Sequence, residues 1–192
     1  MSAQAPTVCI LYGFCEGPLE AIRFRRLLRA AGYQITTSSA TADIIIGHSG
    51  GCFLVPEHPA AKLIIQIGIP YWPGRSILKS LCLKIIADWR DHHKGGSIRF
   101  WLRKTGWNGL YFWNMVNNVR MLRGRHAGTL WRFGSVTTVV RPEKDPVCTP
   151  DASALPFTTP PRFITIPGQH DDCWRYPQDY IALIQAEYAK RA

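Results

Sequence analysis

Three consecutive isoleucines constrain the fold of this chain more than any other feature. Ile44, Ile45 and Ile46 cannot alternate between a buried and an exposed face, as a half-exposed strand requires. They predict a strand that is buried on both faces, which is typical of the middle of a parallel sheet. Further short apolar runs predict strands at 7–12, 33–38, 62–69, 136–140 and 163–166.

Helical patterns separate these strands. Apolar residues recur at helical spacing in 19–31, with arginines between them, and a second amphipathic pattern closes the chain at 177–189. Pro56 and Pro59 restrict the helix after the central strand to a short one. The alternation of strands and helices predicts an α/β fold, in which a mostly parallel central sheet has helices on both faces.

The central strand runs directly into Gly47-His48-Ser49-Gly50-Gly51, which fits the pattern G-x-S-x-G. In this pattern the serine lies on a sharp turn from strand to helix, and the glycines leave room for the close contact between the two. The serine hydroxyl then projects beside a helix N-terminus, which favours a developing negative charge. A Gly-rich turn without chemistry is the alternative interpretation. The buried strand before the motif favours a nucleophile elbow.

A serine nucleophile needs a base, and the base needs an orienting acid. In a parallel α/β sheet such residues come from loops after the strands. His170 follows the last predicted strand, and Asp145 follows the strand before it. Asp171 and Asp172 compete with Asp145 for the role of acid, although residues next to the base rarely have the reach to orient it. Asp145 could also be a simple turn former.

Several stretches together resemble the α/β-hydrolase superfamily. They are the elbow after a buried strand, the stretch Val-Thr-Thr-Val-Val-Arg-Pro-Glu-Lys-Asp-Pro and the stretch Ile-Pro-Gly-Gln-His-Asp-Asp. They occur in the family's order of serine, acid and histidine. Tyr12-Gly13-Phe14 is similar to the turn after the first core strand, which supplies an oxyanion-hole amide, although the family often has His-Gly there.

The resemblance implies a role for each of these residues. Ser49 is the expected nucleophile, His170 the base and Asp145 the orienting acid, and the backbone amides of Phe14 and Gly50 are expected to hold the oxyanion. It also implies a minimal hydrolase core without the usual first hairpin. The predicted core comprises residues 1–74 and 133–192, and residues 75–132 form a helical lid insert.

The predicted insert has an unusual composition. It holds 12 of the 23 basic residues and 2 of the 13 acidic ones, so the whole formal net charge of +10 lies there. Five of the seven tryptophans also fall in it. One interpretation is that the aromatic residues pack the insert on the core while the basic residues are solvated. The other is that the aromatic residues line a substrate pocket, with contacts expected from Tyr12, His48, Trp107 and Trp113.

The resemblance implies a serine hydrolase of carboxylic esters that forms an acyl-enzyme. The substrate is a small or medium acyl or aryl ester, with lactones and thioesters as further candidates, and neither a metal nor an organic cofactor is needed. The alternative is a non-catalytic protein of the same fold, whose basic insert binds nucleic acid, an anionic membrane or a protein partner. The insert is also the expected interface of a homodimer.

The remaining sequence features predict a cytoplasmic protein. No apolar run reaches the length of a membrane span, and the N-terminus lacks a secretory pattern. The six cysteines are scattered, without a Cys-x-x-Cys pair, which favours reduced thiols over a disulfide framework or a zinc site.

Overall fold

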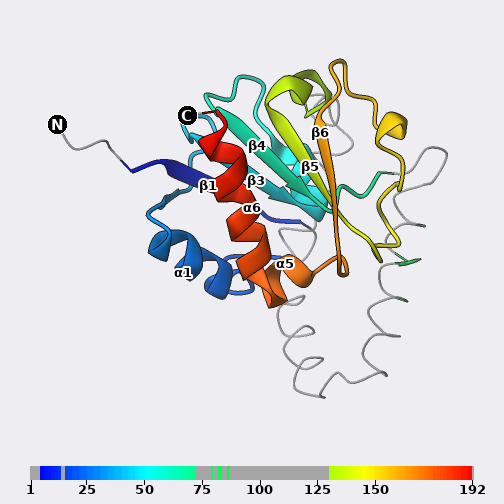
Figure 1. Cartoon of the computed structure of the whole chain (residues 1–192), viewed down its shortest axis with the longest axis horizontal. Helices are drawn as coiled ribbons and strands as arrows, with labels where there is room; N and C mark the ends of the chain where they lie inside the picture. Colours follow the sequence, from blue (N-terminus) through cyan, green and yellow to red (C-terminus); the bar gives the residue numbers. More distant parts are fainter. Residues whose placement is uncertain are drawn as a thin grey trace.

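The computed structural model describes residues 5–13, 16–71, 79, 82–83, 86 and 130–191. Within these ranges six strands form one sheet, in the order β2-β1-β3-β4-β5-β6, and every neighbouring pair is parallel. The prediction of an α/β fold with a mostly parallel central sheet is therefore confirmed (Figure 1). The strands are β1 (Thr7–Leu11), β2 (Gln34–Thr36), β3 (Ile44–His48), β4 (Leu63–Ile67), β5 (Thr137–Pro142) and β6 (Arg162–Ile166).

The helical segments follow the predicted patterns in part. The helix α6 (Pro177–Ala189) has the predicted bounds, and α1 (Ile22–Ala30) is shorter than the predicted 19–31. The short helix α5 (Asp172–Arg175) was not predicted. Three 3-10 segments complete the described part of the chain: η1 (Ser49–Leu54), η3 (Leu130–Val136) and η4 (Ala152–Ala154).

The predicted insert at 75–132 lies almost entirely outside the described residues. The dimer interface expected on this insert therefore stays a prediction. Within the described ranges, no helix has the length and apolar composition needed to cross a bilayer. The cysteines of these ranges are all free thiols, at positions 9, 52, 82, 148 and 173.

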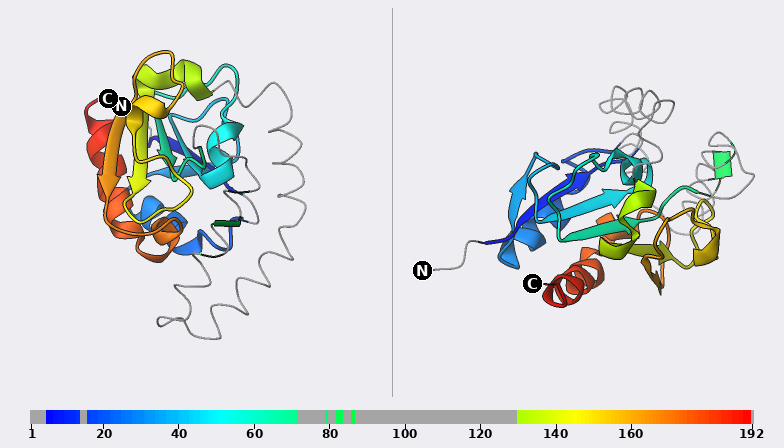
Figure 2. Two further views of the ribbon diagram at one scale, coloured as in Figure 1. Left: turned by 90° about the vertical axis from the view of Figure 1, so that its right-hand side faces the viewer. Right: turned by 90° about the horizontal axis from the view of Figure 1, so that it is seen from above.

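The isoleucines of β3 alternate between two buried layers. Ile44 and Ile46 belong to the core that α1, α5 and α6 cover, whereas Ile45 belongs to the core on the other face, beside η1 and η3. Figure 2 shows η1 on the opposite side of the sheet from α6. All five residues of β3 are buried, as are all five of β4. A strand covered on both faces explains why this segment is continuously apolar.

The order of the strands brings the loops after β1 and β3 together. The chain goes outward from β1 to β2 and then crosses back to β3 on the other side of β1. Such a reversal opens a crevice at the carboxyl ends of the strands, where α/β proteins place their sites. The elbow at Ser49 follows β3 directly and therefore lies at this position.

The close approach of β1 to the elbow gives a test of the fold. A Cβ atom on Gly51 would overlap the carbonyl oxygen of Leu11 and lie 2.8 Å from the carbonyl carbon of Tyr12. Because both neighbours are backbone, we expect Gly51→Ala to lower the free energy of unfolding by at least about 2 kcal/mol in a urea titration.

Gly32→Ala is the control for this measurement. Gly32 has a φ of 88°, but a Cβ atom there would meet nothing within 4 Å, so only the backbone strain remains. We expect this variant to lose about 1 kcal/mol. Equal losses in the two variants would contradict the close contact at Gly51.

Candidate active site

Ser49 has a strained backbone. Its φ of 52° makes it the one residue with a side chain, among those the structure describes, that adopts a positive φ. A side chain at such an angle costs of order 1–3 kcal/mol and is held only when the surroundings fix it. Ser49 is also buried, with 4% of its surface exposed. A sharp, strained turn between β3 and η1 is the geometry that the pattern G-x-S-x-G predicts.

Gly13 lies directly against this turn. A Cβ atom on Gly13 would come 2.7 Å from Cβ of Ser49 and 2.9 Å from the carbonyl oxygen of His48. The turn after β1 and the elbow are therefore in contact through a position that only glycine can occupy. Phe14, the predicted oxyanion donor of that turn, lies outside the described residues. Gly50, the other predicted donor, is buried as the second residue of η1.

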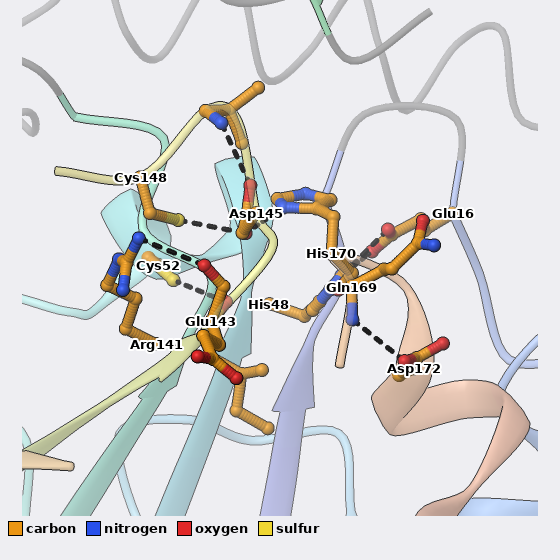
Figure 3. A network of polar contacts seen from close by, with 12 residues as sticks. Glu16, His48, Cys52, Arg141, Glu143, Asp145, Cys148, Gln169, His170 and Asp172 are labelled. Atoms are coloured by element: carbon orange, nitrogen blue, oxygen red, sulfur yellow. Dashed lines mark hydrogen bonds and ion pairs between the residues drawn. The ribbon is translucent and has the colours of Figure 1, made fainter. Parts of the chain in front are cut away.

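His170 and Asp145 form a buried pair at the ends of neighbouring strands. Nδ1 of His170 lies 2.6 Å from Oδ2 of Asp145, and both side chains are almost completely buried. Asp145 also accepts hydrogen bonds from the backbone N–H of Val147 at 2.9 Å and from the thiol of Cys148 at 3.0 Å (Figure 3). Burial works to raise the pKa of Asp145, but the His170 ring and the other two donors outweigh it and lower the pKa.

The second ring nitrogen of His170 is available for chemistry. Nε2 is buried and has no hydrogen-bond partner among the described residues. Gly68, directly after β4, makes room for the ring: a Cβ atom there would lie 3.1 Å from Cε1 and Nδ1 of His170. Its φ of 64° favours glycine as well. The Nδ1–H group of His170 donates to Asp145, which leaves Nε2 as the nitrogen that can accept a proton.

A second acid–histidine pair lies beside the first, and its acid was not predicted from the sequence. Nδ1 of His48 lies 2.8 Å from Oε2 of Glu16, and Nε2 of His48 lies 2.8 Å from the carbonyl oxygen of His170. The backbone N–H of Gly13 donates to Oε2 of Glu16 at 2.8 Å. No motif signals Glu16, because it lies in a turn and meets His48 only through the fold.

Of the four residues predicted to contact a substrate, the structure describes His48 and Tyr12. The contact predicted between His48 and a substrate stays a prediction. The ring of His48 is completely buried, and both of its nitrogens have partners inside the protein. Side-chain alternation along β3 explains this, since His48 points into the same layer as Ile44 and Ile46. Tyr12 is half-buried, with its ring centroid 6.2 Å from that of Trp174. Trp107 and Trp113 lie outside the described residues.

The two acids beside His170 do not replace Asp145 in its hydrogen bond to Nδ1. Asp172 accepts the backbone N–H of Gln169 at 2.7 Å, so its carboxylate holds the loop itself (Figure 3). Asp171 is buried, and one of its carboxylate oxygens lies within 4.8 Å of ring nitrogens of both His48 and His170.

Among the residues that the structure describes, two sets of side chains bring metal-ligating atoms within 4.8 Å of one another. They are His48 with His170 and Asp171, and Asp145 with Cys148 and His170. In both sets, hydrogen bonds already use ring nitrogens or carboxylate oxygens that a cation would need. The geometry therefore fits a hydrogen-bonded site better than a metal centre.

Comparison with known proteins identifies the fold but no close relative. No family model and no curated protein matches the chain. Similar solved structures include the thioesterase domain from the curacin biosynthetic pathway, with 14% identity, a TM-score of 0.58, and coverage of 96% of this chain and 92% of that one. Another is an alpha/beta hydrolase enzyme from the metagenome of sediments of the Mar Chica lagoon in Morocco, with 16% identity, a TM-score of 0.56, and coverage of 97% and 92%.

A third similar structure comes from work on carboxylesterases of the ammonia-oxidizing thaumarchaeon Nitrososphaera gargenis. It has 12% identity and a TM-score of 0.60, with coverage of 98% of this chain and 91% of that one. Identities this low show a shared fold. The sheet order and the elbow described above agree with that fold.

The lowered pKa of Asp145 predicts a loss of stability in acid. The unfolded carboxyl titrates near its ordinary value of 3.8, whereas the folded one stays ionised to lower pH. The stabilisation is therefore complete above that range and is lost as the pH falls through the lowered pKa. We expect the free energy of unfolding of Asp145→Asn, measured by urea titration from about pH 5 downward, to fall less steeply than that of the wild type.

Asp179→Asn, which removes one carboxylate from the exposed face of α6, controls for the loss of a charge. If Asp145→Asn and the wild type lose the same free energy on acidification, the pair with His170 does not hold Asp145 ionised.

Proposed function

We propose that this chain, which has the α/β-hydrolase fold, is a serine hydrolase of carboxylic esters. Ser49 is the nucleophile, His170 the general base and Asp145 the orienting acid. The observation that carries the proposal is the pair of His170 and Asp145 at 2.6 Å, in which the other ring nitrogen is buried and unpartnered among the described residues. The strained elbow at Ser49 supports it, since strain of this kind clusters at sites of chemistry.

The proposed reaction begins with proton transfer. His170 Nε2 takes the proton of the Ser49 hydroxyl as its oxygen attacks the ester carbonyl, and Asp145 stabilises the imidazolium that forms. Ser49 adjoins His48, whose ring centroid is 5.0 Å from that of His170, so the elbow and the base meet at one end of the sheet. In the apo state the hydrogen bond between nucleophile and base is often long, and it tightens when substrate binds.

The negative charge of the tetrahedral intermediate needs donors. The backbone amides of Gly50 and Phe14 are the proposed oxyanion hole, and each donor contributes about 3 kcal/mol to such sites. His170 then gives its proton to the departing alcohol, and a water activated by the same ring hydrolyses the acyl-enzyme. The structural neighbours include thioesterases as well as carboxylesterases, so the leaving group to test is an alcohol or a thiol.

Covalent labelling tests the nucleophile. We expect the protein to react with a fluorophosphonate probe and to hydrolyse short p-nitrophenyl esters and acyl thioesters. Ser49→Ala and His170→Ala should each lower kcat/KM by about 10³-fold or more, because the members of a triad act as a unit. Mass spectrometry of the labelled protein should place the adduct on the peptide that contains Ser49.

Two matched variants control for unspecific effects. Ser38→Ala and His58→Ala remove an exposed serine and an exposed histidine, and both should retain labelling and turnover. A folded wild-type protein that neither labels nor hydrolyses any of these substrates would contradict the proposed function, as would an adduct on another residue.

A further inference from the structure

The pair of Glu16 and His48 joins two loops that are distant in the sequence. Glu16 comes from the turn after β1, His48 ends β3, and the carbonyl oxygen that His48 contacts belongs to His170, in the loop after β6. The contacts span 32 and 122 residues of the chain. Figure 3 shows Glu16, His48 and His170 at the same end of the sheet.

The partners of His48 determine how it is protonated. A carbonyl oxygen only accepts, so Nε2 of His48 donates to His170. The carboxylate of Glu16 accepts as well, from Nδ1 of His48 and from the backbone N–H of Gly13. Burial acts to lower the pKa of His48, but Cys173 and Glu16 raise it well above its ordinary value. Because Glu16 and the carbonyl group of His170 are both acceptors, the geometry is that of a ring that donates at both nitrogens.

The burial of this pair calls for an explanation. His48 is 0% exposed and Glu16 is 4% exposed. A buried ion pair is costly to desolvate, and well-packed apolar side chains of similar volume are often as stable or more so. The pair does supply fixed hydrogen bonds to two separate backbone groups, at Gly13 and at His170. Gly13 precedes the proposed oxyanion donor, and His170 is the proposed base. A serine hydrolase must align both of these groups with its nucleophile.

We propose that Glu16 and His48 are positioning residues, which couple the turn after β1 to the loop that carries His170. The pair holds Gly13 against Ser49 from one side and fixes the backbone of the base from the other. The effect of this coupling on catalysis rests on the proposed function, whereas the coupling of the two loops does not.

One substitution removes the link and another preserves it. Glu16→Ala takes away the acceptor for both Gly13 and His48. Glu16→Gln removes the charge but can keep the contacts of the link. The amide oxygen accepts from Gly13, the amide N–H donates to Nδ1 of a neutral His48, and Nε2 of His48 still donates to His170. His48→Ala removes the ring that contacts both Glu16 and the backbone of His170.

Glu187→Ala is the matched control. Glu187 is a buried glutamate with 2% exposure, whose carboxylate holds Lys190 at 2.6 Å and Thr138 at 3.3 Å. It lies on α6, in contact with β5 and β6 residues rather than with the loops of the site. Its loss should lower stability without loosening either loop.

Deuterium exchange tests the coupling without reference to activity. In Glu16→Ala and in His48→Ala, we expect peptides that contain Gly13 and peptides that contain His170 to exchange faster together, by about tenfold or more, while β3 and β4 stay protected. Glu16→Gln and Glu187→Ala should exchange like the wild type in both loops. If Glu16→Ala loosens the Gly13 turn but leaves the His170 loop unchanged, the coupling is overturned.

Kinetics on an ester substrate tests the consequence. Misplacement of the base or oxyanion donor by about 1 Å costs up to about 100-fold in rate, so Glu16→Ala should lower kcat about 10- to 100-fold with KM nearly unchanged. Glu16→Gln should restore most of the activity. If Glu16→Ala loosens both loops but leaves kcat unchanged, the pair is structural and the positioning role is overturned. If the wild type is inactive while Glu16→Ala and His48→Ala still loosen both loops together, the proposed function is overturned and the coupling stays in place.

Discussion

The backbone of Ser49 is the constraint on which the rest of the site depends. A residue with a side chain stays at a φ of 52° only where its surroundings leave it no alternative. Ser49 follows a well-supported strand, because β3 is paired with β1 on one side and with β4 on the other, and all of its residues are buried. Gly13 and Gly51 let the neighbouring backbone come close enough to fix the turn. A minimal sheet can therefore carry a strained residue at its centre.

The topology separates the proposed nucleophile from its proposed partners, and a glycine after β4 leaves room for them to meet. Asp145 and His170 follow β5 and β6, whereas Ser49 follows β3, so β4 lies between them. A side chain at the end of β4 would fill the space that the base needs. Gly68 occupies that position, with a positive φ and with His170 and Asp145 packed over its α-carbon. The base can thus extend over β4 toward the elbow.

Much of this arrangement could be predicted from the sequence, because it is encoded locally. A run of buried aliphatic residues predicts a central strand, and the prediction for β3 is confirmed in both its position and its burial on both faces. Long-range contacts between polar residues have no such local signal. Glu16 lies in a Gly- and Pro-containing turn, and only the packing of β1 beside β3 shows that it meets His48. The four residues of α5 are likewise too few for a helical period to be visible.

The two buried acid–histidine pairs have the same hydrogen bond at Nδ1 but different partners at Nε2. Each places a carboxylate on Nδ1 of a histidine, and each carboxylate accepts further donors that offset the cost of its burial. They differ at Nε2. In His48 this nitrogen donates to a backbone carbonyl, which fixes the ring and removes it from chemistry. In His170 the same nitrogen is unpartnered among the described residues. A buried polar group without a partner is costly, and a role in a reaction would explain that cost. The His48 ring, whose nitrogens both have partners, contacts the backbone of His170. In the proposed coupling, the first pair therefore positions the second.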